Sequence, residues 1–90
     1  MTDRLAPRRK RLMFQSARRG TRESDLVLGG FARRHLAALS EDQLDRFEAL
    51  LELNDPELLG WIIGLEPVPA AHDHDVMDLL KDFKKTISSN

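Results

Sequence analysis

The stretch Arg18-Arg19-Gly20-Thr21-Arg22-Glu23-Ser24-Asp25 lies between two segments with helical patterning and determines where the chain turns. Its glycine follows a run of good helix formers, where a left-handed residue can close a helix at no steric cost. We expect Arg18 and Arg19 in the last turn of the first helix, where cations complement the helix dipole. Glu23 and Asp25 would begin the next helix, where anions do the same. The sequence therefore predicts a tight corner with an arginine and a carboxylate on opposite sides of one glycine.

This corner has two interpretations. From spacing alone, a well-capped joint between two helices, closed by a local ion pair, explains these residues. The alternative is an exposed recognition surface, and the rest of the chain bears on that choice.

Length and composition restrict the classes of protein that fit. Ninety residues make one small domain, which can hold a single helical core but no deep cleft between domains. The apolar fraction of 41% and the charged fraction of 32% are ordinary for a globular protein. The chain has no cysteine, so it can form neither a disulfide framework nor a thiolate metal site.

No segment has the pattern of a membrane span or a targeting signal. The longest apolar stretch, around Leu58 to Leu65, is interrupted by two glycines. The basic N-terminal segment is not followed by the apolar region of a secretory signal, and it leads directly into the first predicted helix. We therefore expect a bacterial cytoplasmic protein, or one of the mitochondrial matrix if the source is eukaryotic.

The net charge of −1 conceals two halves of opposite sign. Residues 1–40 carry ten Lys/Arg against three Asp/Glu, and residues 41–90 carry four against twelve. This division indicates either a basic face for an acidic partner or compensation between the halves.

Helical signals recur along the chain after a flexible N-terminus, residues 1–7. The first helix would begin at Arg8, with Pro7 suited to its first turn. The second would extend to about Leu39, and the Gly29-Gly30 pair would kink it or allow another backbone to approach closely. Ser40-Glu41-Asp42-Gln43 is a capping box and opens a third helix.

Two further helices complete the pattern. Asp55 as N-cap and Pro56 as first residue would open a fourth helix, in which Trp61 is a core anchor and which stops near Gly64. A fifth follows His72-Asp73-His74-Asp75, with Asp73 or Asp75 as its cap, and residues 88–90 would be a flexible tail. The fold class is therefore all-α: a small five-helix bundle in a single domain, residues 8–87.

Neither a catalytic nor a metal site is predicted. The acidic side chains of the third helix have no cleft around them, and no nucleophile lies at a defensible spacing from a base. A His-x-His segment could bind a metal, but residues two apart do not share a helix face and no third ligand cluster exists. The basic run Arg8–Arg11 could contact phosphates, although only one aromatic residue lies near it and no nucleic-acid-binding module surrounds it.

Taken together, these motifs resemble the small FAD assembly factors of succinate dehydrogenase, the SdhE family, called succinate dehydrogenase assembly factor 2 in mitochondria. The signature Arg-Gly-x-x-Glu is present as Arg19-Gly20-Thr21-Arg22-Glu23. The segment Arg11–Ser16 precedes it, Ser24-Asp25-Leu26 follows it, and Asn54-Asp55-Pro56-Glu57-Leu58 leads into Trp61. The resemblance covers roughly residues 8–83.

The resemblance implies a non-catalytic five-helix bundle that binds the flavoprotein subunit of succinate dehydrogenase and promotes covalent attachment of FAD to a client histidine. In some bacteria fumarate reductase would be a second client. The factor itself would be a monomer that holds no tightly bound cofactor and no metal. Its partner-binding residues would be Arg19, Gly20 and Glu23, with Arg18, Arg22 and Asp25 as supporting contacts.

Two rival functions use other features. A nucleic-acid or regulatory protein-binding module would use the basic arm Arg8–Arg11 and bind with a steep dependence on salt. The other alternative is an antitoxin-like or cytoskeletal regulatory partner, and no residue of this sequence argues for it independently.

Overall fold

The computed structural model describes residues 3–88, and every regular element in that range is a helix or helical turn. The elements, in chain order, are α1 (Ala6–Ala17), α2 (Arg22–Ser24), the π-helix η1 (Asp25–Gly29), α3 (Gly30–His35), the 3₁₀-helix η2 (Leu36–Ala38), α4 (Glu41–Leu51), α5 (Asp55–Ile62), the 3₁₀-helix η3 (Ala70–His72) and α6 (Asp75–Ser88). The elements from α2 to η2 follow one another without a break. The described part of the chain therefore forms five main helices, and the all-α prediction is confirmed.

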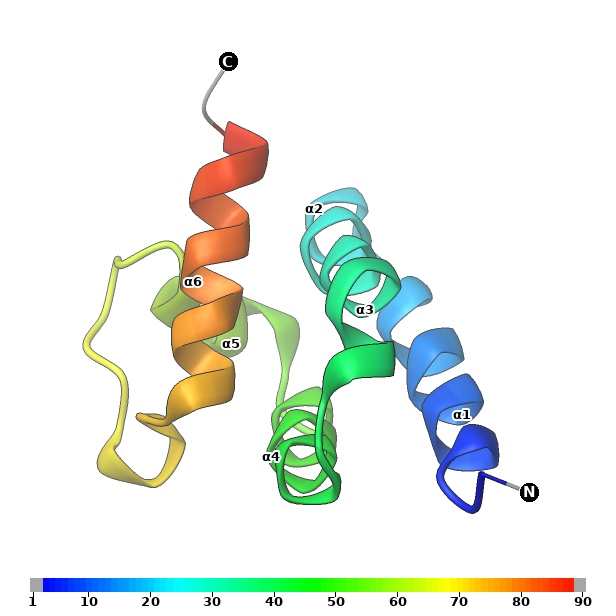
Figure 1. Cartoon of the computed structure of the whole chain (residues 1–90). Coiled ribbons are helices and arrows are strands. Elements are labelled where there is room, and N and C mark those ends of the chain that lie inside the picture. Colours follow the sequence, from blue (N-terminus) through cyan, green and yellow to red (C-terminus); the bar gives the residue numbers. More distant parts are fainter. Residues whose placement is uncertain (1–2, 89–90) are drawn as a thin grey trace.

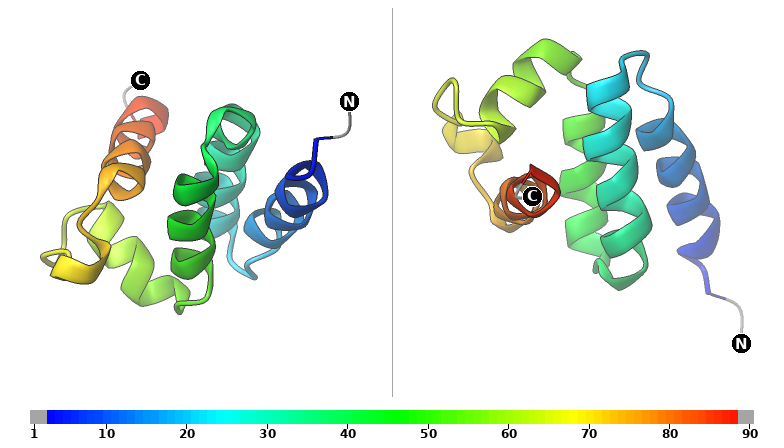
Figure 2. Two further views of the ribbon diagram at one scale, coloured as in Figure 1. Left: turned by 60° about the horizontal axis from the view of Figure 1, so that its bottom comes forward. Right: turned by 90° about the horizontal axis from the view of Figure 1, so that it is seen from above.

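The helices form two groups that meet at the core. α1, the continuous α2–η2 helix and α4 lie side by side, whereas α5 and α6 cover one flank of this group (Figure 1). In the right-hand view of Figure 2, α6 is seen end-on, whereas α1 and α3 lie in the plane of the picture. The axis of α6 is therefore steeply inclined to theirs. All the main helices bury apolar side chains between them. The largest fully buried ones are Phe31, Phe47, Leu12, Leu28, Leu36, Leu44, Leu50, Leu58, Met77, Leu80, Val27 and Val76.

The two adjacent glycines of the second helix allow close packing on both sides. A Cβ on Gly29 would lie 3.3 Å from the Cα of Ala17 in α1. A Cβ on Gly30 would lie 2.9 Å from the ring of Phe83 in α6, closer than real Cβ contacts allow. The predicted close approach is confirmed, and Gly29 ends a π-helical turn rather than a sharp kink.

The bounds of α1 differ from the prediction at both ends. The helix begins at Ala6, two residues before Arg8, with Pro7 in its first turn. It ends at Ala17, so the expectation that Arg18 and Arg19 occupy its last turn is wrong. The cause is local: the backbone N–H of Arg19 donates to the carboxylate of Asp25 at 2.7 Å instead of continuing the helical ladder.

The cap of α4 was predicted correctly and those of α5 and α6 were not. Ser40 and Gln43 form the predicted capping box. The cap of α5 is Asn54, whose side chain accepts from Glu57 N–H at 2.9 Å, so Asp55 is the first helical residue and its carboxylate is available for other contacts. His74 occupies the cap position of α6 and accepts from Met77 N–H through Nδ1 at 3.2 Å. Asp75 is the first helical residue, and its carboxylate accepts from Val76 N–H at 2.8 Å.

α5 ends as the sequence predicts. Gly64 has a φ of +84°, and its N–H donates to the carbonyl of Trp61. The N–H of Leu65 donates to the carbonyl of Gly60 at 2.9 Å, which completes a Schellman motif. The indole of Trp61 is buried and stacks on His72 with ring centroids 5.5 Å apart, so its assignment to the core is confirmed.

The predicted flexible ends lie partly outside the described residues, since residues 1–2 and 89–90 are not described. Within the described range, Arg4 pairs with Glu41 of α4, and Leu5 packs against the core.

Candidate functional site

The corner between α1 and α2 consists of four residues, 18–21, of which only the glycine has a positive φ. Gly20 has a φ of +105°, as the sequence predicts. The next residue, Thr21, returns to an extended backbone and caps α2, because its Oγ1 accepts from Ser24 N–H at 3.2 Å. The chain therefore reverses direction within the corner and starts a new helix at Arg22.

Arg19 points into the protein and closes a contact with the α4–α5 junction. Its Nε donates to Asp55 Oδ1 at 2.8 Å and its Nη2 donates to the carbonyl of Leu53 at 2.8 Å. Its Nη1 donates to the carbonyl of Leu51, in the last turn of α4. Only 12% of each side chain of the Arg19–Asp55 pair is exposed. The guanidinium thus binds the carbonyl end of one helix and the first side chain of the next.

The same aspartate also holds the start of α2. The second oxygen of Asp55 accepts from Ser24 Oγ at 3.0 Å, and Ser24 is fully buried. Asp25 completes the arrangement by accepting the backbone N–H of Arg19. We refer to Arg19, Ser24, Asp25 and Asp55 as the clamp. It ties the corner to a segment about 35 residues away in the sequence.

The remaining charged residues of the corner are exposed. Arg18 lies over the ring of Phe14, with its guanidinium carbon 4.3 Å from the ring centroid. Within residues 3–88, no hydrogen bond or ion pair involves the side chains of Arg22 and Glu23. The corner therefore presents one arginine and one glutamate that no internal contact neutralises.

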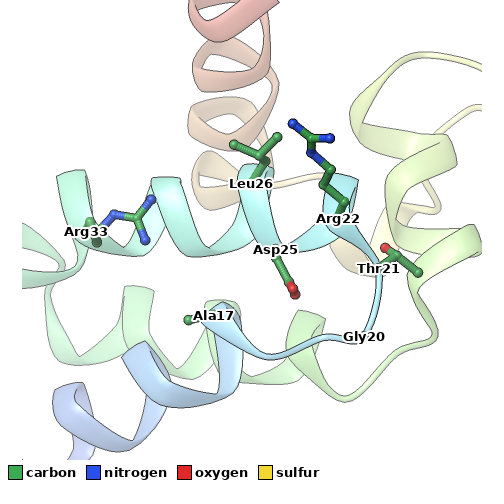
Figure 3. Close-up of a pocket in the computed structure, with 7 residues that line it drawn as sticks. All are labelled: Ala17, Gly20, Thr21, Arg22, Asp25, Leu26 and Arg33. Atoms are coloured by element: carbon green, nitrogen blue, oxygen red, sulfur yellow. The ribbon is translucent and has the colours of Figure 1, made fainter.

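A hollow of about 560 Å³ opens over the corner. Its lining residues are Ala17, Gly20, Thr21, Arg22, Asp25, Leu26 and Arg33. The carboxylate of Asp25 is directed toward the Gly20 loop, whereas Arg22 and Leu26 project from the opposite side of the helix (Figure 3). A Cβ on Gly20 would meet no atom within 4 Å, so the space above the glycine is open to a partner.

The structure brings all six predicted partner-binding residues together but divides them by orientation. Arg19 and Asp25 are used internally, while Arg18, Arg22 and Glu23 are exposed around Gly20. Sequence reasoning missed Leu26 and Arg33 as lining residues. Nothing in the sequence indicates that Leu26 is 53% exposed, because it stands in an apolar run with Val27 and Leu28, which are buried.

The basic arm lies along the acidic face of α4. Arg8 pairs with Asp45 and Glu48, and Arg11 pairs with Glu48. Hydrogen bonds to Asp45 and Glu48 raise the pKa of Arg8 above its ordinary value. These ion pairs join the basic half of the chain to the acidic half, so the charges of the two halves compensate each other here.

Arg9 serves the second helix instead. Its Nε and Nη2 donate to the carbonyls of Leu36 and Leu39, at 3.2 and 2.9 Å, where the second helix ends. Three of the four basic residues of the arm thus have internal contacts.

The His72–Asp75 segment joins two helices: His72 ends η3 and Asp75 begins α6. Burial lowers the pKa of His74, which favours the neutral imidazole that accepts from Met77 N–H. Across residues 3–88, no cluster of three or more His, Cys, Asp or Glu side chains could hold a metal ion. In the same range no helix is long and apolar enough to cross a membrane.

Comparison with known proteins gives a consistent result. A protein-family model described as the flavinator of succinate dehydrogenase matches residues 10–84. The FAD assembly factor SdhE of Acetobacter pasteurianus is 42% identical over 67 residues, which are 74% of this chain and 62% of that protein. The mitochondrial succinate dehydrogenase assembly factor 2 of Aedes aegypti is 36% identical over 83 residues, 90% of this chain and 52% of that protein.

A relative from Dictyostelium discoideum with the same mitochondrial assembly-factor name is 38% identical over 77 residues, 86% of this chain and 55% of that protein. The chain thus spans between about half and three fifths of the length of these relatives.

Proposed function

The chain belongs to the family of flavinators of succinate dehydrogenase, and we propose that it binds the flavoprotein subunit of that enzyme and promotes covalent attachment of FAD. The observation that carries the proposal is the family match over residues 10–84, which includes the corner and every main helix in part or in full. The relatives from Aedes aegypti and Dictyostelium discoideum are named as assembly factors of succinate dehydrogenase.

The corner supplies the partner-binding residues in this proposal. Glu23, Arg22 and Arg18 make charge-assisted contacts with the client, since their side chains are exposed. Gly20 lets the client approach closely, because no atom of this chain occupies the space where a side chain would lie. Arg19 and Asp25 act through position: the clamp fixes the backbone that presents the others.

The factor works without catalytic groups of its own. The client forms the bond between FAD and its histidine, and this protein raises the population of the client conformation in which the two are aligned. FAD is the cofactor attached to the client and does not bind this chain tightly. The factor acts as a monomer, in the bacterial cytoplasm or, in a eukaryote, the mitochondrial matrix, and fumarate reductase is a second client in some bacteria.

The test is in-gel flavin fluorescence of the denatured flavoprotein subunit from cells that lack this gene. We expect the covalent signal to be lost in the deletion and restored by the wild type, but not by Glu23→Ala or Gly20→Arg. Both variants should retain the helical circular dichroism of the wild type, since residues 20 and 23 lie outside the core, although Gly20→Arg should unfold more readily because of the positive φ at this position. An unchanged signal in the deletion would refute the proposed function.

The rival function is tested by the matched variant Arg8→Gln/Arg11→Gln. Because these arginines pair with α4, we expect this variant to restore flavinylation and the corner variants to fail. Loss of flavinylation in the arm variant alone, with salt-dependent binding of nucleic acid by the wild type, would favour the basic-arm module instead.

A further inference from the structure

A second hollow, of about 360 Å³, lies between the start of the second helix and the last turns of α6. Arg22, Glu23, Leu26 and Val27 line one side, and Lys84 and Ile87 line the other. We call this hollow the α6 groove. Leu26 and Ile87 are 53% and 37% exposed, and they are large apolar side chains from distant parts of the sequence that meet at one place.

The α6 groove is continuous with the corner. Arg22 and Leu26 line both hollows, so Leu26 stands as a ridge between them. Arg22 and Leu26 project to the side facing α6, away from the Gly20 loop (Figure 3). A partner that covers the corner would have to leave Leu26 in water or extend over it into the groove.

The charges at the rim restrict the occupant. Within the described residues, neither Arg22 nor Lys84 forms an ion pair with an acidic side chain, and Lys84 Nζ donates to Ser88 Oγ at 2.5 Å. Glu23 lies at the same rim, so two cations and one carboxylate leave it with a net positive charge, and a second copy docked symmetrically here would bring two positive rims together, which like-charge repulsion disfavours. A partner segment with an apolar side chain next to a carboxylate satisfies both the floor and the rim.

We propose that the α6 groove is a second contact site for the flavoprotein client and accepts an apolar side chain flanked by an acidic residue. This inference rests on the proposed function, since it names the same client. It extends the client-binding surface from the Arg-Gly-x-x-Glu corner, across Leu26, to the C-terminal end of α6. Leu26 is the shared anchor, Ile87 the far wall, and Lys84 the partner of the acidic residue.

The experiment uses a photo-crosslinking benzophenone amino acid at Thr21, Ile87 or Leu65 of the full chain, mixed with purified flavoprotein that has not yet received FAD. Thr21 reports on the corner and Ile87 on the groove. Leu65 is the control, since it is 77% exposed and lines neither hollow. We expect crosslinks to the flavoprotein from Thr21 and Ile87 and none from Leu65.

Each of the other outcomes would contradict either the groove as a contact site or client binding itself. Crosslinks from Thr21 alone would refute the groove and leave the proposed function intact. A crosslink from Ile87 to a second copy of this chain, or equal crosslinks from Ile87 and Leu65, would also refute the groove. No crosslink from any position would count against client binding itself.

Binding measurements give a second readout. We expect Ile87→Ser and Lys84→Glu each to weaken flavoprotein binding about tenfold, as for a contact of ordinary interface strength, and Leu65→Ser to leave it unchanged. Ile87 and Lys84 lie near the end of α6 and outside the buried core, so these variants should fold. Unchanged affinity in both groove variants would refute the inference.

Discussion

The basic arm and the corner are both rich in arginine, yet they use it in opposite ways. In the arm, Arg8 and Arg11 lie on the acidic face of α4, and their charge is compensated within the chain. In the corner, Arg19, whose side chain is only 12% exposed, holds the backbone, whereas the neighbouring Arg22 and Glu23 stay exposed. A cluster of charge therefore does not identify a binding surface, since what matters is whether the fold has already supplied its partners.

Among the variants that test this contrast, those in the clamp should have the largest effect on the free energy of unfolding. Arg19→Ala would remove the cation that pairs with Asp55 and the donor to two backbone carbonyls, so we expect it to lower the free energy of unfolding by about 3 kcal/mol. The adjacent Arg18→Ala should cost less than about 1 kcal/mol, because it removes one exposed cation–π contact. Urea unfolding of the two variants measures the difference, and equal losses would contradict the assignment of the clamp.

A smaller change in the free energy of unfolding should show how far the corner depends on the backbone conformation of Gly20. Gly20→Ala forces a residue with a Cβ to adopt a φ of +105°, and should lower the free energy of unfolding by about 1–2 kcal/mol. Gly60→Ala is the matched control, because its Cβ would also meet nothing within 4 Å but its backbone is helical. We expect Gly60→Ala to raise stability by about 0.5–1 kcal/mol. Thermal unfolding of both would show opposite signs, and a neutral Gly20→Ala would refute the conformational argument.

The smallest effect is a pH dependence at the exposed Arg4–Glu41 pair, which lies just before the basic arm. The hydrogen bond from Arg4, and then its charge, lower the pKa of Glu41 from the ordinary value of 4.5. A carboxylate with a lowered folded-state pKa stabilises the fold above its unfolded value, and the contribution is lost as pH falls through the folded value. Stability of the wild type should therefore fall more steeply below pH 4.5 than that of Glu41→Gln.

Salt provides the check on the same pair. Because both side chains are exposed, about 1 M salt should remove the difference between wild type and Glu41→Gln. The contribution of the buried clamp should change little under the same conditions. Parallel pH profiles of wild type and Glu41→Gln at low salt would show that the Arg4–Glu41 pair contributes nothing to stability.

Local features of the fold followed from the sequence, and those set by distant residues did not. The Ser40–Gln43 capping box, the left-handed Gly20 and the end of α5 near Gly64 each depend on a few neighbouring residues, and all are present. The cap of α5 was misplaced by one residue, since Asn54 and Asp55 both suit that position and Pro56 is tolerated at either of the next two.

The candidate site divides in the same way. Its position was predicted from Arg19-Gly20-Thr21-Arg22-Glu23, and its residues do lie together. The orientation of Arg19 was not predictable, because its carboxylate partner lies 36 residues away and its other acceptors are backbone carbonyls. The hollow between Leu26 and α6 was not predictable either, because no local sequence pattern places α6 beside Leu26.

The clamp has a consequence for how this sequence can change over evolution. The Arg-Gly-x-x-Glu segment and the Asn-Asp-Pro-Glu segment look like two separate motifs, but Arg19 and Asp55 are two halves of one contact. Losing either half alone leaves the other charge buried and unpaired, so drift at one position should be tolerated only with compensation at the other. We expect divergent relatives to keep both residues or to replace both, and to inherit the two segments as a single unit.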